Sequence, residues 1–136
     1  MNGSCPYGSN AKPPDPKEDL LLYKKMREMI SYGNGVLNNG QFPRKYRISN
    51  AIGAQIEKSM FEAMRLINRA MAKEHKKAVL EEADAELKNL RQLILIASDP
   101  GYDNRVILIA SKQQLHWSAQ LIEIGKILGS WLNKLK

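Results

Sequence analysis

The chain has 136 residues, of which 43% are hydrophobic, 26% charged and 7% aromatic, a length that suits one domain with a core large enough to need no disulfide or metal. Its 21 Lys and Arg outnumber its 14 Asp and Glu, which gives a formal net charge of +7. No apolar run approaches the roughly 18–20 residues of a membrane span, no apolar signal segment follows the N-terminus, and a single cysteine excludes an internal disulfide. These observations predict a soluble, basic, intracellular domain.

Residues 1–18 are expected to form a flexible arm ahead of a folded domain at 19–136. The first 16 residues carry four of the six prolines and two of the nine glycines, and they show no apolar periodicity. Cys5 lies in this arm, and we interpret it as an incidental exposed thiol because no catalytic-cysteine pattern surrounds it.

From Asp19 onward the apolar residues recur at helical spacing. The first amphipathic segment has its stripe at Leu22, Met26, Met29, Gly33 and Val36, and the glycines and asparagines between 33 and 40 make its end the least defined boundary. The second segment has its stripe at Ile52, Ile56, Ser59, Ala63, Leu66 and Ala70, widened by Ile48, Met60, Ile67 and Met71. Ser49 is the expected N-cap of this second helix.

The third segment has its stripe at Leu80, Ala83, Leu87, Leu90, Ile94 and Ala97, and it ends where the sequence SDPG at 98–101 breaks the pattern. In the last segment an unbroken alternation of three- and four-residue steps predicts one helix of about 30 residues. Its stripe consists of Ile107, Ala110, Gln114, Trp117, Leu121, Ile124, Leu128, Trp131 and Leu135. Asp103 or Asn104 is its expected N-cap, and the heptad overrides the β-like run at 106–109.

Four amphipathic helices joined by short links, with almost no strand pattern, predict an all-α fold. An antiparallel up-down four-helix bundle is the arrangement that buries all four stripes together. A basic helix lying on a membrane surface is less compatible with the pattern, because the apolar faces are already needed for this core.

The positive charge is concentrated in the N-terminal half of the chain. Residues 1–78 hold 14 Lys and Arg against 7 Asp and Glu, whereas residues 79–136 hold 7 of each. The loop at 42–47, FPRKYR, contributes Arg44, Lys45 and Arg47, interleaved with two aromatic residues. The second helix adds a stripe at Lys58, Arg65, Arg69 and Lys73, with only Glu62 among them.

Like charges one turn apart repel on an isolated helix, so a stripe of four cations gains stability when an anion lies across it. These positions therefore form a candidate surface for the phosphates of a nucleic acid. An ordinary solvated helix face that keeps the protein soluble has the same charge pattern, and charge alone leaves both interpretations open.

The sequence lacks the patterns of a catalytic or metal centre. No Glu-x-x-His pair occurs and the apolar stripes contain no carboxylate, which excludes a ferritin-like metal site. His75 and His116 are isolated and are interpreted as surface or interface residues, and no phosphate-binding glycine loop, nucleophile elbow or pair of catalytic carboxylates is found. We therefore expect no enzymatic activity, metal or cofactor, and an enzyme that uses either histidine is the alternative to this expectation.

Two glycines and two tryptophans on the last helix bear on packing. Gly125 and Gly129 lie one turn apart, and each costs about 1 kcal/mol relative to alanine. Close approach of another helix, from the same bundle or from a neighbouring subunit, is the simplest compensation, and it favours an oligomer. Trp117 and Trp131 fall on the core stripe, so packing is their expected role.

The last helix also carries a family motif at residues 124–132, IGKILGSWL. This stretch resembles the closing helix of the accessory variability proteins of diversity-generating retroelements, the Avd family. Two further landmarks lie earlier in the chain, in the same order as in the family. They are the triplet PRK at 43–45, and the sequence ADA at 83–85 followed by LR at 90–91. The resemblance covers residues 20–136.

The resemblance implies a four-helix bundle that assembles into a homo-oligomeric, pentameric barrel with a basic surface. Such proteins bind the retroelement's reverse transcriptase and its template-repeat RNA, and they support mutagenic retrohoming without catalytic activity of their own. The resemblance further implies that Arg44, Lys45 and Arg91 contact the nucleic acid or the polymerase. It also implies a cytoplasmic protein encoded by a prokaryote or a phage.

Two alternatives share much of this pattern. Four-helix bundle proteins encoded in intervening sequences of large-subunit ribosomal RNA genes have the same fold and general pattern. A protein–protein adaptor would use a basic face against an acidic polymerase surface. A reverse transcriptase gene beside this one, with paired template and variable repeats, would favour the retroelement class.

Overall fold

The computed structural model describes residues 16–38, 42–72, 76–103 and 105–135. Most of them lie in four helices, α1 (Pro16–Asn38), α2 (Arg47–Ala72), α3 (Lys76–Ser98) and α4 (Ser111–Lys134). Within these ranges the sole β-type pairing is an isolated bridge between Asp103 and Val106. The prediction of an all-α fold with four helices is thereby confirmed for the described part of the chain. None of the described helices is long and apolar enough to cross a membrane.

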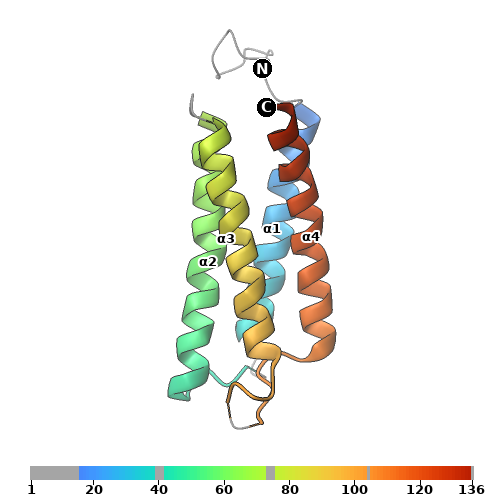
Figure 1. The fold of residues 1–136 in the computed structure, drawn as a ribbon. Helices are drawn as coiled ribbons and strands as arrows, with labels where there is room; N and C mark the ends of the chain where they lie inside the picture. Colours follow the sequence, from blue (N-terminus) through green and yellow to red (C-terminus); the bar gives the residue numbers. More distant parts are fainter. Residues whose placement is uncertain (1–15, 39–41, 73–75, 104, 136) are drawn as a thin grey trace.

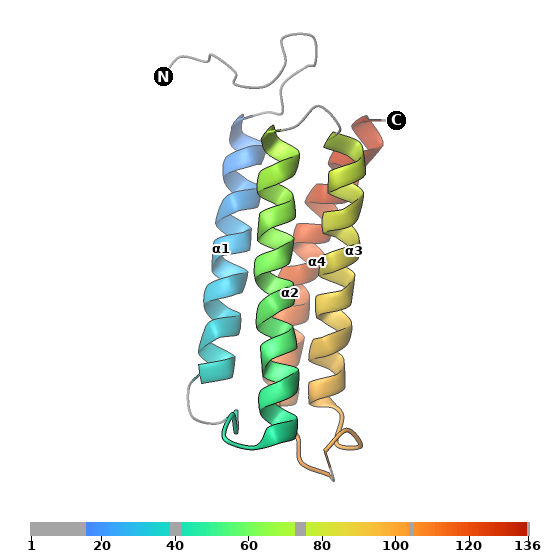
Figure 2. The same ribbon diagram turned by 90° about the vertical axis from the view of Figure 1, so that its left-hand side faces the viewer.

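The four helices stand side by side and form one bundle (Figures 1 and 2). Around the bundle each helix packs against two neighbours, in the order α1, α2, α3, α4 and back to α1. The closest packing is between α2 and α3, whereas α1 and α2 make the least contact of the four neighbouring pairs. The side of the bundle between α1 and α2 is therefore its most open one.

The core consists of the apolar stripes that the sequence predicts. Every stripe position predicted for the first three helices is buried, apart from the widening residue Ile48, and on α4 the run from Trp117 to Trp131 is buried as well. Burying one large aliphatic or aromatic side chain contributes about 1.5–3 kcal/mol to the free energy that favours folding. These stripes therefore supply most of the favourable free energy of folding. Trp117 has no exposed surface and Trp131 is 5% exposed, which confirms their packing role.

Two helices begin earlier than predicted. α1 begins at Pro16 and not at Asp19, because proline has no N–H to lose at the first helical position and its fixed φ suits a helix. α2 begins at Arg47, so Ser49, predicted as its N-cap, lies inside the first turn. The buried Ser49 hydroxyl bonds instead to the carbonyl oxygens of Pro43 and Tyr46.

The last helix begins later than predicted, at Ser111 and not before Ile107. Residues 99–110 form a link in which Arg105 has a positive φ of 72°. The backbone N–H groups of Leu108 and Ile109 donate to the carbonyl oxygen of Ala97, at 3.1 and 3.2 Å, and thus satisfy an acceptor that the end of α3 leaves without a helical partner. Ile107 is consequently 56% exposed and is not part of the core.

The predicted caps and outer stripe positions of this region are also wrong. Asp103 lies in the link and Asn104 is outside the described residues. The residue at the N-cap is Ala110, whose backbone N–H donates to Gln113 Oε1 at 3.2 Å. Leu135, the last member of the predicted stripe, is 41% exposed because it lies just beyond the end of α4.

The structure rejects one of the two explanations for the glycines of α4. A Cβ atom placed on Gly125 or on Gly129 meets no other atom within 4 Å. No other helix among the described residues therefore packs closely against them, and the predicted close approach within the bundle is wrong.

Candidate nucleic-acid interface

Four cationic side chains share one outward face of α2, which we call the α2 cationic face. It consists of Arg47, Lys58, Arg65 and Arg69, all of them exposed. Successive residues of a helix turn by about 100°, so the steps of eleven, seven and four residues bring these side chains back to nearly the same direction. The rise of a helix places Arg47 and Arg69 about 33 Å apart along the axis. Lys73, the fourth member of the stripe predicted from the sequence, is outside the described residues.

Arg47 reaches this face because of where α2 starts. The sequence placed it in the loop before the helix, whereas the structure makes it the first helical residue. Arg47 of the predicted basic loop thus shares one face of α2 with Lys58, Arg65 and Arg69 of the predicted basic stripe.

One cation of the α2 cationic face is paired. The Arg65 guanidinium donates from Nε to Glu62 Oε1 at 2.9 Å and from a terminal nitrogen to Glu62 Oε2 at 2.7 Å. This hydrogen bonding, followed by the charges of Arg65, Lys58 and Arg69, holds the pKa of the exposed Glu62 carboxyl below its ordinary value. No ion pair joins Lys58 or Arg69 to another described residue, so these two cations are available to an outside anion.

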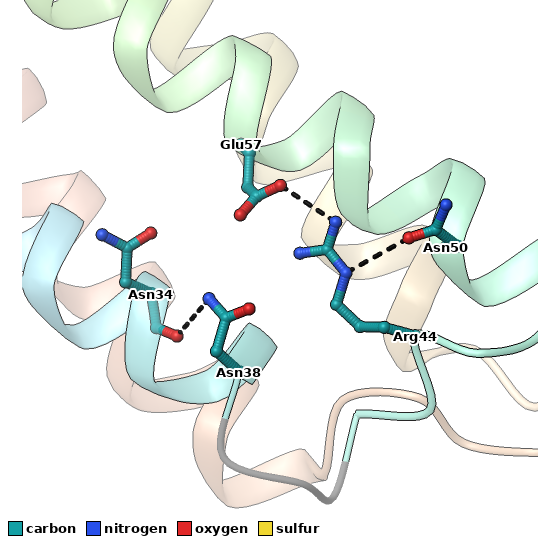
Figure 3. Close-up of polar contacts among 5 residues, drawn as sticks. All are labelled: Asn34, Asn38, Arg44, Asn50 and Glu57. Carbon is teal, nitrogen blue, oxygen red and sulfur yellow. Dashed lines mark hydrogen bonds and ion pairs between the residues drawn. The ribbon is translucent and has the colours of Figure 1, made fainter.

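Arg44 lies partly buried beside α2 and is not part of the cationic face. Its guanidinium donates to Glu57 Oε1 at 3.0 Å and to Asn50 Oδ1 at 3.3 Å, both on α2 (Figure 3). Next to it the buried Phe42 ring packs on Gly53, where a Cβ atom would approach Phe42 Cε1 to 3.0 Å. Arg44 therefore joins the link to the helix in this structure, and its contact with nucleic acid or polymerase stays a prediction.

The two residues after Arg44 are more open. Lys45 is exposed, and its ammonium lies 5.2 Å from the centre of the Tyr46 ring, a cation–π contact. Tyr46 is itself 57% exposed. Lys45 and Tyr46 thus present an exposed cation and an exposed ring directly before Arg47 in the chain.

Arg91 is exposed on α3 but on a different side of the bundle. The side chains of Glu86 and Asn89 face α2, because both contact the Ser59 hydroxyl, at 2.6 and 3.5 Å. Arg91 follows Asn89 by two residues, about 200° around the helix, so it lies on the opposite flank of α3. The structure therefore does not bring Arg91 together with the α2 cationic face.

A groove between α1 and α2 lies beside this face, and sequence reasoning missed it. The groove has a volume of about 510 Å³. Its walls include Tyr23, Arg27 and Ile30 from α1 and Phe61, Met64 and Asn68 from α2. The sequence feature that could have indicated this groove is Phe61, a large apolar residue outside the core stripe. In the structure Phe61 is 52% exposed.

The alternative of an enzyme rests on the two histidines. His116 is exposed on α4, with its ring 4.3 Å from the Tyr32 ring, and His75 is outside the described residues. In the described ranges no group of three or more His, Cys, Asp or Glu residues is placed to hold a metal ion.

Comparison with known proteins gives one result. A protein-family model described as bAvd-like matches residues 20–135, a range that runs from α1 to the residue after α4. This match confirms the resemblance seen in the sequence. No curated protein and no solved structure matches the chain.

Proposed function

The chain belongs to the bAvd-like family, and from this premise we propose that it binds the reverse transcriptase and the template-repeat RNA of a diversity-generating retroelement. The family is one of accessory, non-catalytic proteins. In this role the protein supports mutagenic retrohoming in the cytoplasm of a prokaryotic host, while the polymerase performs the chemistry.

The observation that carries the proposal is the α2 cationic face. Its four cations lie on one side of a single helix, and Glu62 is the one carboxylate paired with them. Phosphate contacts of this kind release counterions from the nucleic acid and supply affinity that does not depend on sequence. A protein that accompanies a long RNA through cDNA synthesis needs this type of affinity.

We further propose that the protomer is an antiparallel bundle and that five protomers form a ring. On α4, Leu115, Ile122 and Gly129 lie at steps of seven residues, and thus along one line of the helix. Leu115 is 64% and Ile122 42% exposed, and Gly129 has empty space above it. A neighbouring subunit packed on this line would bury the two apolar side chains and use the space above the glycine.

Assembly would also multiply the charge. Five copies of a chain of net charge +7 carry a combined formal charge of five times seven, or +35. Modest contacts on separate protomers then act together on one RNA, because each contact after the first is intramolecular.

The proposal is tested by co-expressing the chain with the reverse transcriptase and a template-repeat RNA, and purifying the complex with and without nuclease. We expect both partners to co-purify, an RNA-dependent share of polymerase binding, and a protein mass of five chains by light scattering. A monomer that retains neither partner would contradict the proposal. Polymerase binding that survives nuclease, without RNA binding by the chain itself, would instead support the pure adaptor.

A further inference from the structure

We propose that the groove between α1 and α2 binds the bases of an unpaired stretch of nucleic acid, while the α2 cationic face holds the phosphates of the same stretch. This inference rests on the proposed RNA binding and adds to it the form of the RNA and the residue that contacts its bases. Four features of the groove carry it.

The first feature is an opening of suitable size and shape. α1 and α2 make the least contact of the neighbouring helix pairs, and a shallow hollow of about 510 Å³ lies between them. It is open to the surface and is not an enclosed cavity. A chain of nucleotides can therefore enter it from the side without unfolding the bundle.

The second feature is an exposed aromatic ring at the edge of the groove. The Phe61 ring is 52% exposed on a helix face that is otherwise polar, and the Tyr23 ring lines the same groove from α1. Aromatic side chains placed this way serve as platforms for unstacked bases. Because Phe61 lies one turn before Arg65 and one turn after Lys58, a base on its ring lies beside two phosphate-binding positions.

The third feature is charge. None of the described residues that line the groove is acidic, and Arg27 stands at its α1 side. With Arg27 on one side and the α2 cationic face on the other, the groove is bordered by cations from both helices. The second hollow of the described surface, between α1 and α4, includes Glu28 among its lining residues and is less suited to a polyanion.

The fourth feature is a set of uncharged polar groups. Ser31, Asn34 and Asn68 line the groove, and each amide side chain offers both donors and an acceptor. Such groups recognise the exposed edges of bases. In a duplex the base faces are stacked on one another and cannot reach Phe61, so the groove selects single-stranded segments.

The inference is tested with fluorescently labelled probes whose binding is followed by anisotropy. The probes are a single-stranded oligouridylate of about twelve nucleotides, close to the site size of compact single-strand binders, an abasic strand of the same length, and a blunt RNA duplex. The protein variants are Phe61→Ala, Phe61→Leu and Phe61→Tyr, with Ile107→Ala in the link before α4 as the control for an exposed apolar residue outside the groove.

We expect Phe61→Ala to weaken oligouridylate binding about 5- to 100-fold, the range of one lost base–aromatic stack, with an unchanged salt dependence. Phe61→Leu is expected to weaken it similarly, because leucine is apolar but has no ring face, and Phe61→Tyr to retain wild-type affinity. The abasic strand should bind wild type and Phe61→Ala equally. Ile107→Ala should bind oligouridylate as the wild type does.

Three results would overturn the inference, and each has a distinct meaning. If all Phe61 variants bind oligouridylate as tightly as wild type while neutralising the α2 cations weakens binding, RNA binding stands and the groove is not part of it. If Phe61→Ala lowers the oligomer mass or polymerase binding without affecting RNA, the groove is a protein contact. If no probe binds wild type at low salt, the proposed RNA binding fails as well.

Discussion

Gly33 of α1 lies directly against Trp117 of α4. A Cβ atom on Gly33 would come within 2.4 Å of Trp117 Cζ2 and 2.6 Å of Met60 Sδ, closer than real atoms approach. The absence of a side chain at position 33 is thus what lets the largest buried residue fit between α1, α2 and α4. This contact explains why a glycine interrupts an otherwise apolar stripe in the middle of a helix.

Replacing Gly33→Ala should therefore destabilise the fold, although alanine favours a helix by about 1 kcal/mol over glycine. Overpacking a dense core costs about 1–3 kcal/mol, and Trp117 has no exposed surface into which it can move. Denaturant unfolding followed by circular dichroism should show a net loss of up to about 2 kcal/mol. An unchanged or raised midpoint would show that the core rearranges around the methyl group at little cost.

The matched change in the open part of α4, Gly129→Ala, should stabilise the isolated protomer, whereas Gly33→Ala destabilises it. Nothing lies within 4 Å of its added Cβ atom, so the helical preference of about 1 kcal/mol acts unopposed. Gly129→Leu should keep the helicity of the wild type and reduce the oligomer to smaller species, as measured by light scattering. An intact oligomer after Gly129→Leu would remove this residue from the subunit contact.

Replacing Glu62→Gln should strengthen RNA binding. The change releases the Arg65 guanidinium from its two hydrogen bonds and removes the carboxylate from the α2 cationic face. Exposed charge pairs are worth a few tenths to 1 kcal/mol, so we expect binding about two- to fivefold tighter with a steeper salt dependence and nearly the same melting temperature. Weaker binding would mean that Glu62 positions Arg65 for its ligand.

Arg44 and Lys45 should behave differently although they are adjacent. Arg44→Gln breaks the contacts with Glu57 and Asn50, which should cost about 1 kcal/mol and lower the melting temperature by about 3–5 °C. Lys45→Gln removes an exposed cation and should weaken RNA binding without loss of stability. Paired melting and binding curves check both, and a destabilising Lys45→Gln with a neutral Arg44→Gln would refute the assignment.

Much of the fold could be predicted because a helix repeats its core contacts at fixed spacing. Met26, Ile56, Leu90 and Ile124 are all buried where the periodicity puts them. The start of α4 could not be predicted in this way. It depends on a contact between the backbone of Leu108 and the carbonyl of Ala97, which involves the end of another helix and leaves no trace in local periodicity.

The same distinction between helical spacing and contacts across elements applies to the candidate site. Lys58, Arg65 and Arg69 share a face because of their spacing alone, and the sequence therefore revealed them. The pairing of Arg44 with Glu57 joins a loop to a position three turns into α2. It could not be predicted without knowing the path of the link. The groove could not be predicted, because it depends on the separation of α1 and α2, which no pattern within either helix encodes.

The most direct test of the account is the salt dependence of RNA binding for wild type and for Lys58→Gln/Arg69→Gln. Each phosphate contact to a single strand contributes about 0.7 to the slope of log K against log salt. The account predicts that the double variant binds more weakly, with a slope shallower by about 1.4, and keeps the helicity and mass of wild type. An unchanged slope would show that the α2 cationic face is only solvated surface and would contradict the account.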